Sequence, residues 1–229
     1  MGSLPVCDAI GCAYDRSMTA TGAALRAIER VDRLCAEACI DDRCVDAVSF
    51  RLAVLDEIRR VVAFDAFAWL LTDPETEVGS APLADVPCLP ELPRLIRLKY
   101  LTPVNRWTHL DGAVSLLSAS TGGRLERSLA WSELLSEYDV TDVASLVFRC
   151  RYGCWGVLDL WRCGSSDAFT PLDAAFLAAI AKPVTQALRR CVATTFGLAA
   201  PAMVRVGPVM LLSPRTSTSE PRRRRPTTT

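Results

Sequence analysis

Histidine is nearly absent from this sequence, since His109 is the only one in 229 residues. A serine–histidine–aspartate triad would have to use that residue, and no G-x-S-x-G motif is present. No G-x-x-x-x-G-K-[ST] loop surrounds Gly122-Gly123, which excludes the Walker type of phosphate site. We therefore expect no catalytic residues and no enzymatic activity.

Long apolar runs are also missing. The longest, residues 174–181, is far shorter than the roughly 20 residues that span a bilayer. The first twenty residues contain Asp8 and Asp15 and lack the basic start and apolar block of a secretory signal. The sequence predicts a cytoplasmic protein without a membrane partner.

Cysteine is abundant, with ten in the chain, but none forms a C-x-x-C pair. Cys35 and Cys39 are one helical turn apart and Cys44 follows, a spacing at which thiolates can bind a metal. Small side chains packing along a helix explain the same spacing, and we favour that interpretation. We expect no metal site, and no disulfide in a reducing compartment.

Charge is balanced overall but concentrated at one end. Residues 204–229 hold six arginines and one glutamate, so residues 1–203 are net acidic. An acidic body is a poor nucleic-acid surface. The run Arg222–Arg225 lies among proline and threonine, a composition typical of a solvated tail.

The spacing of apolar residues in the first part of the chain predicts helices. Residues 1–18 look irregular, and apolar residues then recur at helical spacing over 21–39 and 44–62. Asp41 or Asp42 would cap the second helix. A strand over 64–72 with a hairpin partner over 77–83 follows.

Two further helices, over 91–101 and 125–138, precede a second hairpin. Its strands cover 142–150 and 154–162 and are apolar on both faces, so we place them in the middle of the sheet.

Thr170, Pro171 and Asp173 resemble a capping box that opens a long helix, which Pro183 should kink. The order of elements predicts an α+β fold, in which the N- and C-terminal helices pack on a mostly antiparallel sheet.

A resemblance to a known family appears at this point. Gly156-Val157-Leu158-Asp159-Leu160-Trp161-Arg162, followed by Phe169-Thr170-Pro171-Leu172-Asp173 and a long helix, resembles the closing pattern of GAF domains. The likeness covers about residues 44–191. It implies an N-terminal extension with a helix over 1–43, a GAF-like sensor domain over 44–196, and a linker and tail over 197–229.

A narrower resemblance is to the GAF-type sensor half of bacterial LuxR-class transcription regulators. Three segments carry it: 69–76, 99–107 and 153–162. In such regulators a helix-turn-helix follows the sensor, but here residues 214–229 are rich in Pro, Arg and Thr. We hypothesise a truncation or a change of reading frame at that point, and direct DNA binding is not expected.

The GAF resemblance implies where a ligand would bind, in a cavity between one sheet face and its covering segment. Trp107 and His109 fall in the expected cover, and Trp69 and Phe148 fall on expected strands. Asp159, an acid inside an apolar strand, either contacts a ligand or forms a structural bond with an arginine or the backbone.

The function implied is a non-catalytic sensory domain that binds a small molecule, forms a homodimer through its terminal helices and takes part in transcription regulation. The sequence names neither ligand nor cofactor. Two alternatives stay open: a module that only dimerises, and a thiol-dependent reductase with the GAF fold.

Overall fold

The structure is a computed structural model that describes the backbone of residues 7–40 and 43–199 and the side chains of 21–38 and 45–192. Its long helices and its strands, in chain order, are α1 (Cys7–Glu37), β1 (Cys39–Ile40), β2 (Arg43–Cys44), α2 (Ala47–Arg59), β3 (Ala66–Thr72), β4 (Gly79–Asp85), α3 (Leu92–Leu101), β5 (Val114–Leu116), β6 (Val140–Cys150), β7 (Gly153–Cys163) and α6 (Pro171–Ala199). Two short helices, α4 (Leu117–Thr121) and α5 (Leu129–Glu133), and four 3-10 turns lie between them.

One sheet of five strands, in the order β4-β3-β7-β6-β5, organises the chain, and every neighbouring pair is antiparallel. The strands β6 and β7 are inside the sheet, as their apolar character on both faces predicts. The α+β prediction, with terminal helices packed on a mostly antiparallel sheet, is confirmed.

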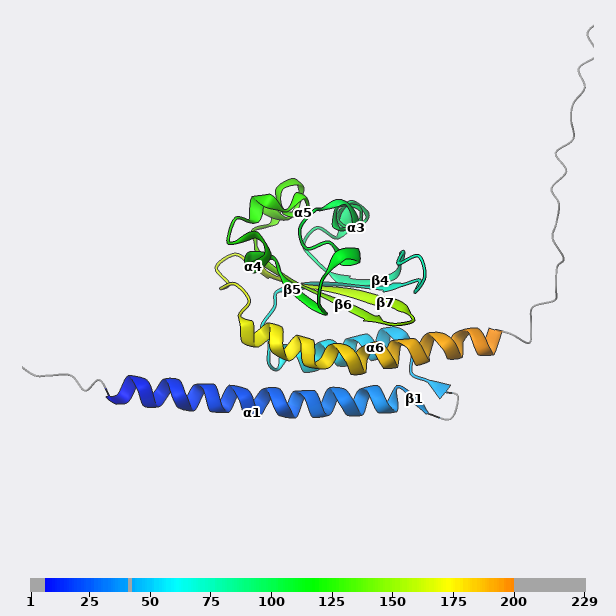
Figure 1. The fold of residues 1–229 in the computed structure, drawn as a ribbon, viewed down its shortest axis with the longest axis horizontal. Helices are drawn as coiled ribbons and strands as arrows, with labels where there is room; N and C mark the ends of the chain where they lie inside the picture. Colours follow the sequence, from blue (N-terminus) through cyan, green and yellow to red (C-terminus); the bar gives the residue numbers. More distant parts are fainter. Residues whose placement is uncertain (1–6, 41–42, 200–229) are drawn as a thin grey trace, which may run out of the picture.

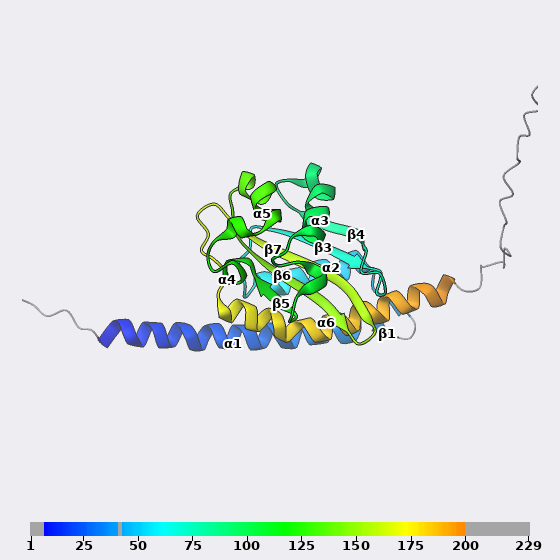
Figure 2. The ribbon, with the colours of Figure 1, turned by 45° about the horizontal axis from the view of Figure 1, so that its top comes forward.

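Helices cover both faces of the sheet (Figures 1 and 2). We call the face toward α1, α2 and α6 the proximal face, and the face toward α3, α4 and α5 the distal face. Leu158 and Leu160 of β7 belong to the proximal core, whereas Trp161 belongs to the distal core. Val31 of α1 is fully buried in the proximal core together with residues of α2 and α6, so α1 is part of the main core.

The capping box that opens α6 is present. The amide of Asp173 donates to Thr170 Oγ1 at 3.1 Å, and the amide of Thr170 donates to Asp173 Oδ2 at 2.8 Å. At α2 the cap is Asp46, whose Oδ2 accepts from the amides of Val48 and Ser49. Asp41 and Asp42, expected in that role, lie outside the described residues.

The sequence-based boundaries differ from the structure at three places. Residues 7–18 were expected to be irregular but are helical, because weak helix formers such as Gly11 hide the pattern. The short hairpin β1–β2 and the strand β5 were not predicted. Residues 125–138 form α5 between 3-10 turns instead of one helix, since Leu134 leaves helical geometry at φ −144°.

Among the described residues, no helix combines the length and the apolar character that a membrane span needs.

Candidate functional site

A row of small and polar residues crosses the sheet. Directly paired residues of neighbouring strands are Ala84 and Ala68, Ala68 and Asp159, Asp159 and Ser145, and Ser145 and Ser115. Paired residues point to the same side of a sheet. Elsewhere the distal face carries large side chains such as Leu70 and Trp161, so this row leaves space for side chains from the covering segment.

Asp159 lies in the middle of the row and is fully buried. Its Oδ1 accepts hydrogen bonds from Ser145 Oγ at 2.5 Å and from Trp107 Nε1 at 2.8 Å. Its Oδ2 lies 3.1 Å from the ammonium Nζ of Lys99. A buried carboxylate is tolerable only with partners of this kind, so the three side chains explain the acid inside an apolar strand.

Lys99 reaches the site from α3. It comes four residues after the buried Leu95, so both side chains lie on the face of α3 that turns toward the sheet. Its ammonium also donates to Ser145 Oγ at 3.0 Å. Burial lowers the pKa of Lys99, and the charge of Asp159 opposes that shift.

Asn105 completes the cluster and leaves an acceptor free. Its Nδ2 donates to Ser145 Oγ at 3.0 Å, and its backbone is left-handed at φ 57°. Asn105 Oδ1 is buried without a hydrogen-bond partner, whereas Asp159 Oδ2 is occupied by the ion pair with Lys99. One buried acceptor therefore remains open to a donor, which is rare in protein interiors.

We call residues 102–110, which follow α3 and include the 3-10 turn η2 (Trp107–His109), the cover segment. Trp107 is buried and packs edge-to-face on Tyr100, with ring centroids 5.6 Å apart. The ammonium of Lys99 lies 5.4 Å from the Trp107 ring, within range of a cation–π contact. Trp107 thus closes the cluster from the side opposite the sheet.

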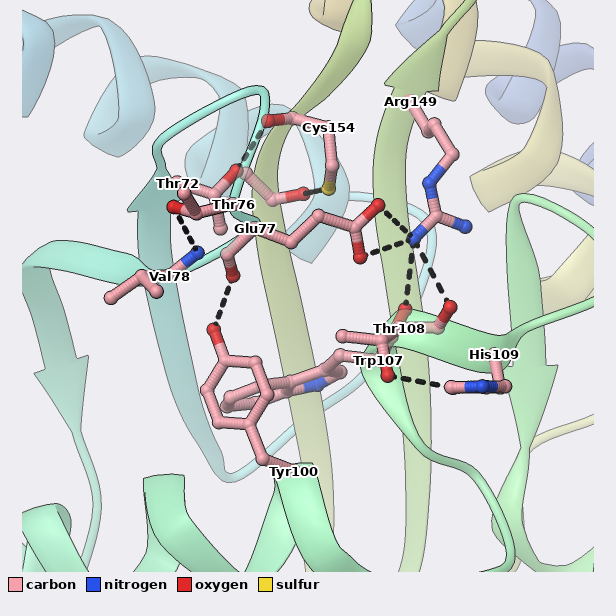
Figure 3. A network of polar contacts seen from close by, with 11 residues as sticks. Thr72, Thr76, Glu77, Val78, Tyr100, Trp107, Thr108, His109, Arg149 and Cys154 are labelled. Atoms are coloured by element: carbon pink, nitrogen blue, oxygen red, sulfur yellow. Dashed lines mark hydrogen bonds and ion pairs between the residues drawn. The ribbon is translucent and has the colours of Figure 1, made fainter.

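Arg149 joins the cover segment to the β3–β4 turn (Figure 3). Its Nη2 lies 2.9 Å from both carboxylate oxygens of Glu77 and 3.5 Å from the carbonyls of Trp107 and Thr108. Tyr100 donates its hydroxyl to the carbonyl of Glu77 at 2.7 Å. The turn, α3 and the cover segment are therefore held together at one edge of the site.

The five sequence-predicted site residues separate into three places. Trp107 and Asp159 meet in the cluster on the distal face. Trp69 and Phe148 stack on each other at 5.1 Å within the proximal core, on the opposite side of the sheet. His109 is exposed and bonds to Thr108 Oγ1 at 2.7 Å. The partners of Asp159 are a lysine and two neutral donors, not the arginine or backbone expected.

Sequence reasoning missed Lys99, Asn105 and Ser145. A charged residue on the apolar face of α3 was the available signal for Lys99. Asn105 and Ser145 gave none, because their role depends on which strands pair and in what register.

The side chains that the structure describes include no group of three metal-binding residues. Burial raises the pKa of the Cys88 and Cys154 thiols. These cysteines are therefore held as thiols near neutral pH, the less reactive form.

Comparisons with known proteins bear on the fold. No protein-family model matches the sequence, and a search of curated proteins gives no match. Among solved structures, the GAF domain of a sensor histidine kinase from Pseudomonas syringae pv. tomato is similar, with a TM-score of 0.50 and 15% identity over 82% of this chain and 99% of that one. The GAF domain of a phosphoenolpyruvate-protein phosphotransferase from Acinetobacter has a TM-score of 0.43 and 12% identity over 74% and 94% of the two chains. The first likeness identifies the fold as that of GAF domains.

Proposed function

We propose that this chain is a non-catalytic sensory domain that binds a small molecule on the distal face of its sheet, beneath the cover segment. The observation that carries the proposal is the buried cluster of Lys99 and Asp159 with Ser145, Asn105 and Trp107. Burial of charged groups costs free energy, because they lose their contacts with water. A cluster of buried charged and polar groups is therefore typical of binding sites.

The open acceptor indicates the chemistry of the ligand. Asn105 Oδ1 has no hydrogen-bond donor, so a molecule with an amine or amide N–H group fits it. Asn105 and Trp107 are 6% and 1% exposed, so entry requires the cover segment to move. That movement would break the contacts of Arg149 with the cover segment and so convert binding into a structural change.

The raised pKa values of Cys88 and Cys154 support a non-catalytic role over that of a thiol-dependent reductase. Turnover of oxidised methionine by the purified protein, lost in Cys88→Ser or Cys154→Ser, would instead favour the reductase.

A role in transcription regulation is supported by the segments 69–76, 99–107 and 153–162, which resemble LuxR-class sensors. We propose that the chain does not bind DNA itself. A mobility-shift assay at physiological salt should show no complex for the full chain or for a form without residues 214–229. A shift that requires those residues would contradict this.

Ligand binding is tested by native mass spectrometry and thermal shift with diamines, amino acids and nucleobases. A binder should raise Tm, because it stabilises the native state alone. Asn105→Ala should abolish that rise, whereas Ser165→Ala, at an exposed turn, should keep it. Equal binding by both variants would place the ligand elsewhere.

A second candidate function, homodimerisation, is favoured by an apolar groove between α1 and the start of α6. The groove has a volume of about 350 Å³, and Leu25 and Leu172 at its wall are 58% and 72% exposed. Residues 7–20 of α1 extend past the start of α6 (Figures 1 and 2). Isolated helices of that length are marginal in water, so a second copy of the chain is the occupant that we propose.

Analytical ultracentrifugation tests the dimer. The full chain should sediment as a dimer, and Leu25→Glu with Leu172→Glu should sediment as a folded monomer. The matched control is Val78→Glu, a similarly exposed residue in the β3–β4 turn, which should leave the dimer intact. A wild-type monomer at high concentration would contradict the proposal.

A further inference from the structure

Cys39 and Cys44 lie directly opposite each other in the short antiparallel hairpin between α1 and α2, where Ile40 pairs with Arg43. The amide of Val45 donates to the carbonyl of Ala38 at 2.8 Å, just outside the cysteine pair. In an antiparallel ladder this bond makes Cys39 and Cys44 a non-hydrogen-bonded pair.

Non-hydrogen-bonded pairs bring strands closest, with α-carbons about 4.5 Å apart. Disulfides need α-carbons between about 4.4 and 6.8 Å apart, so this register meets the requirement without a backbone shift. Sequence spacing alone does not show this, because four residues separate the two cysteines.

We propose that Cys39 and Cys44 are a modification site that forms a reversible intramolecular disulfide with a peroxide as oxidant. One thiolate attacks the peroxide oxygen, which gives a sulfenic acid and releases water from hydrogen peroxide. The second thiolate displaces the sulfenic oxygen, forming the S–S bond and a second water. The two sulfurs are oxidised, the peroxide is reduced, and a thiol reductant reverses the change.

Three other cysteines, Cys35, Cys88 and Cys154, are poorly suited to this chemistry. Burial raises the pKa of Cys35 to about 12, and it also raises the pKa of Cys88 and Cys154. A thiol rather than a thiolate reacts slowly with peroxide.

The position of the hairpin gives the disulfide a structural consequence. Cys191 of α6 lies with its sulfur 4.0 Å from the carbonyl of Ala38, and Arg190 donates to the carbonyl of Cys35. The hairpin therefore sits where the end of α1, the start of α2 and α6 meet. Oxidation would link the two strands of the connection between α1 and α2 at the place where it meets α6.

The test is differential alkylation and peptide mapping of the full chain, reduced and then treated with hydrogen peroxide at sub-stoichiometric steps. We expect each chain to be lighter by about 2 Da, the mass of two thiol hydrogens, with Cys39 linked to Cys44. Dithiothreitol should reverse it, and the oxidised form should melt about 5 °C higher, since the link restricts the unfolded chain.

Cys39→Ser and Cys44→Ser should each abolish the cross-link, and Cys150→Ser, at a half-buried cysteine of β6, should retain it. If a variant does not fold, the peptide map of the unsubstituted protein still shows whether Cys39 is linked to Cys44. Peroxide that leaves both cysteines open to alkylation, or links them to other cysteines, overturns the proposal. The proposal is also overturned if one zinc ion per chain protects Cys39 and Cys44 from alkylation, because the two cysteines would then be metal ligands.

Discussion

The carboxylate of Asp159 and the ammonium of Lys99 lie 3.1 Å apart with side chains 0% and 3% exposed, which makes them a fully desolvated ion pair between β7 and α3. Such a pair contributes little net stability, but removal of one partner leaves an uncompensated charge. Three further polar side chains surround the pair. Desolvation of these groups costs free energy on folding, and their hydrogen bonds hold them in a defined geometry.

Lys99→Met should destabilise the fold by about 3–5 kcal/mol, because Asp159 is left buried without its counter-charge. Lys99→Met combined with Asp159→Asn should cost clearly less than Lys99→Met alone, since the asparagine still accepts from Ser145 and Trp107. Urea unfolding of the two variants measures this. A double variant less stable than the single one would show that the charge of Asp159 is not the cause.

The pH dependence of stability should report Lys99 as well. Its native pKa is lowered by burial, whereas the unfolded side chain titrates near 10.5. Between the lowered native pKa and the unfolded pKa, the unfolded state binds more protons than the native state. This lysine therefore makes the free energy of unfolding rise with pH. Urea unfolding from about pH 7 to about pH 10 should show that rise in the wild type and less of it in Lys99→Met. Parallel curves would mean that the Lys99 pKa is ordinary.

Gly153 at the tip of the β6–β7 hairpin should not tolerate a side chain. Its φ is +121°, and a Cβ would lie 2.1 Å from the carbonyl oxygen of Pro74. Gly153→Ala should cost about 3 kcal/mol or more. Gly164→Ala is the matched control, since φ is +61° there and no atom lies within 4 Å of the added Cβ. That change should cost about 1 kcal/mol, the conformational term alone. Thermal unfolding measures the loss of stability in both variants. Equal losses would show that the contact with Pro74 does not contribute.

Arg149→Met should loosen the cover segment with little loss of global stability. The Glu77–Arg149 pair is partly exposed, so its loss should cost below about 1 kcal/mol. The backbone amides of residues 105–110 should nevertheless exchange hydrogen faster, because the arginine no longer binds the carbonyls of Trp107 and Thr108. Arg94→Met, which breaks an ion pair with Glu91, is the control and should leave that exchange unchanged. Unchanged exchange in Arg149→Met would refute the fastening role.

Much of the fold follows from sequence patterns, but little of the site does. The hairpin of β6 and β7 and the capping box at Thr170 are local features, so spacing and turn chemistry predict them. The cluster combines residues from α3, the cover segment, β6 and β7, whose proximity depends on tertiary packing. Asp159 stood out because an acid in an apolar strand demands a partner, but the identity of that partner required the register of the sheet.

Trp69 and Phe148 show the limit of composition. Both are aromatic residues on sheet strands, where aromatic side chains that line a ligand pocket are expected. Because side chains alternate between the two faces of a strand, however, both of them point into the proximal core. A displacement by one residue along either strand would reverse the face, and the sequence alone does not determine that register.

The most direct test of the sensory proposal follows the indole N–H resonance of Trp107 in a ¹⁵N-labelled chain, assigned with Trp107→Phe. That N–H donates to Asp159 at 2.8 Å, so it reports the centre of the cluster. A compound that binds there should shift this resonance and leave that of Trp69, on the other face of the sheet, in place. Binding that shifts Trp69 alone, or leaves both unchanged, would contradict a ligand site beneath the cover segment.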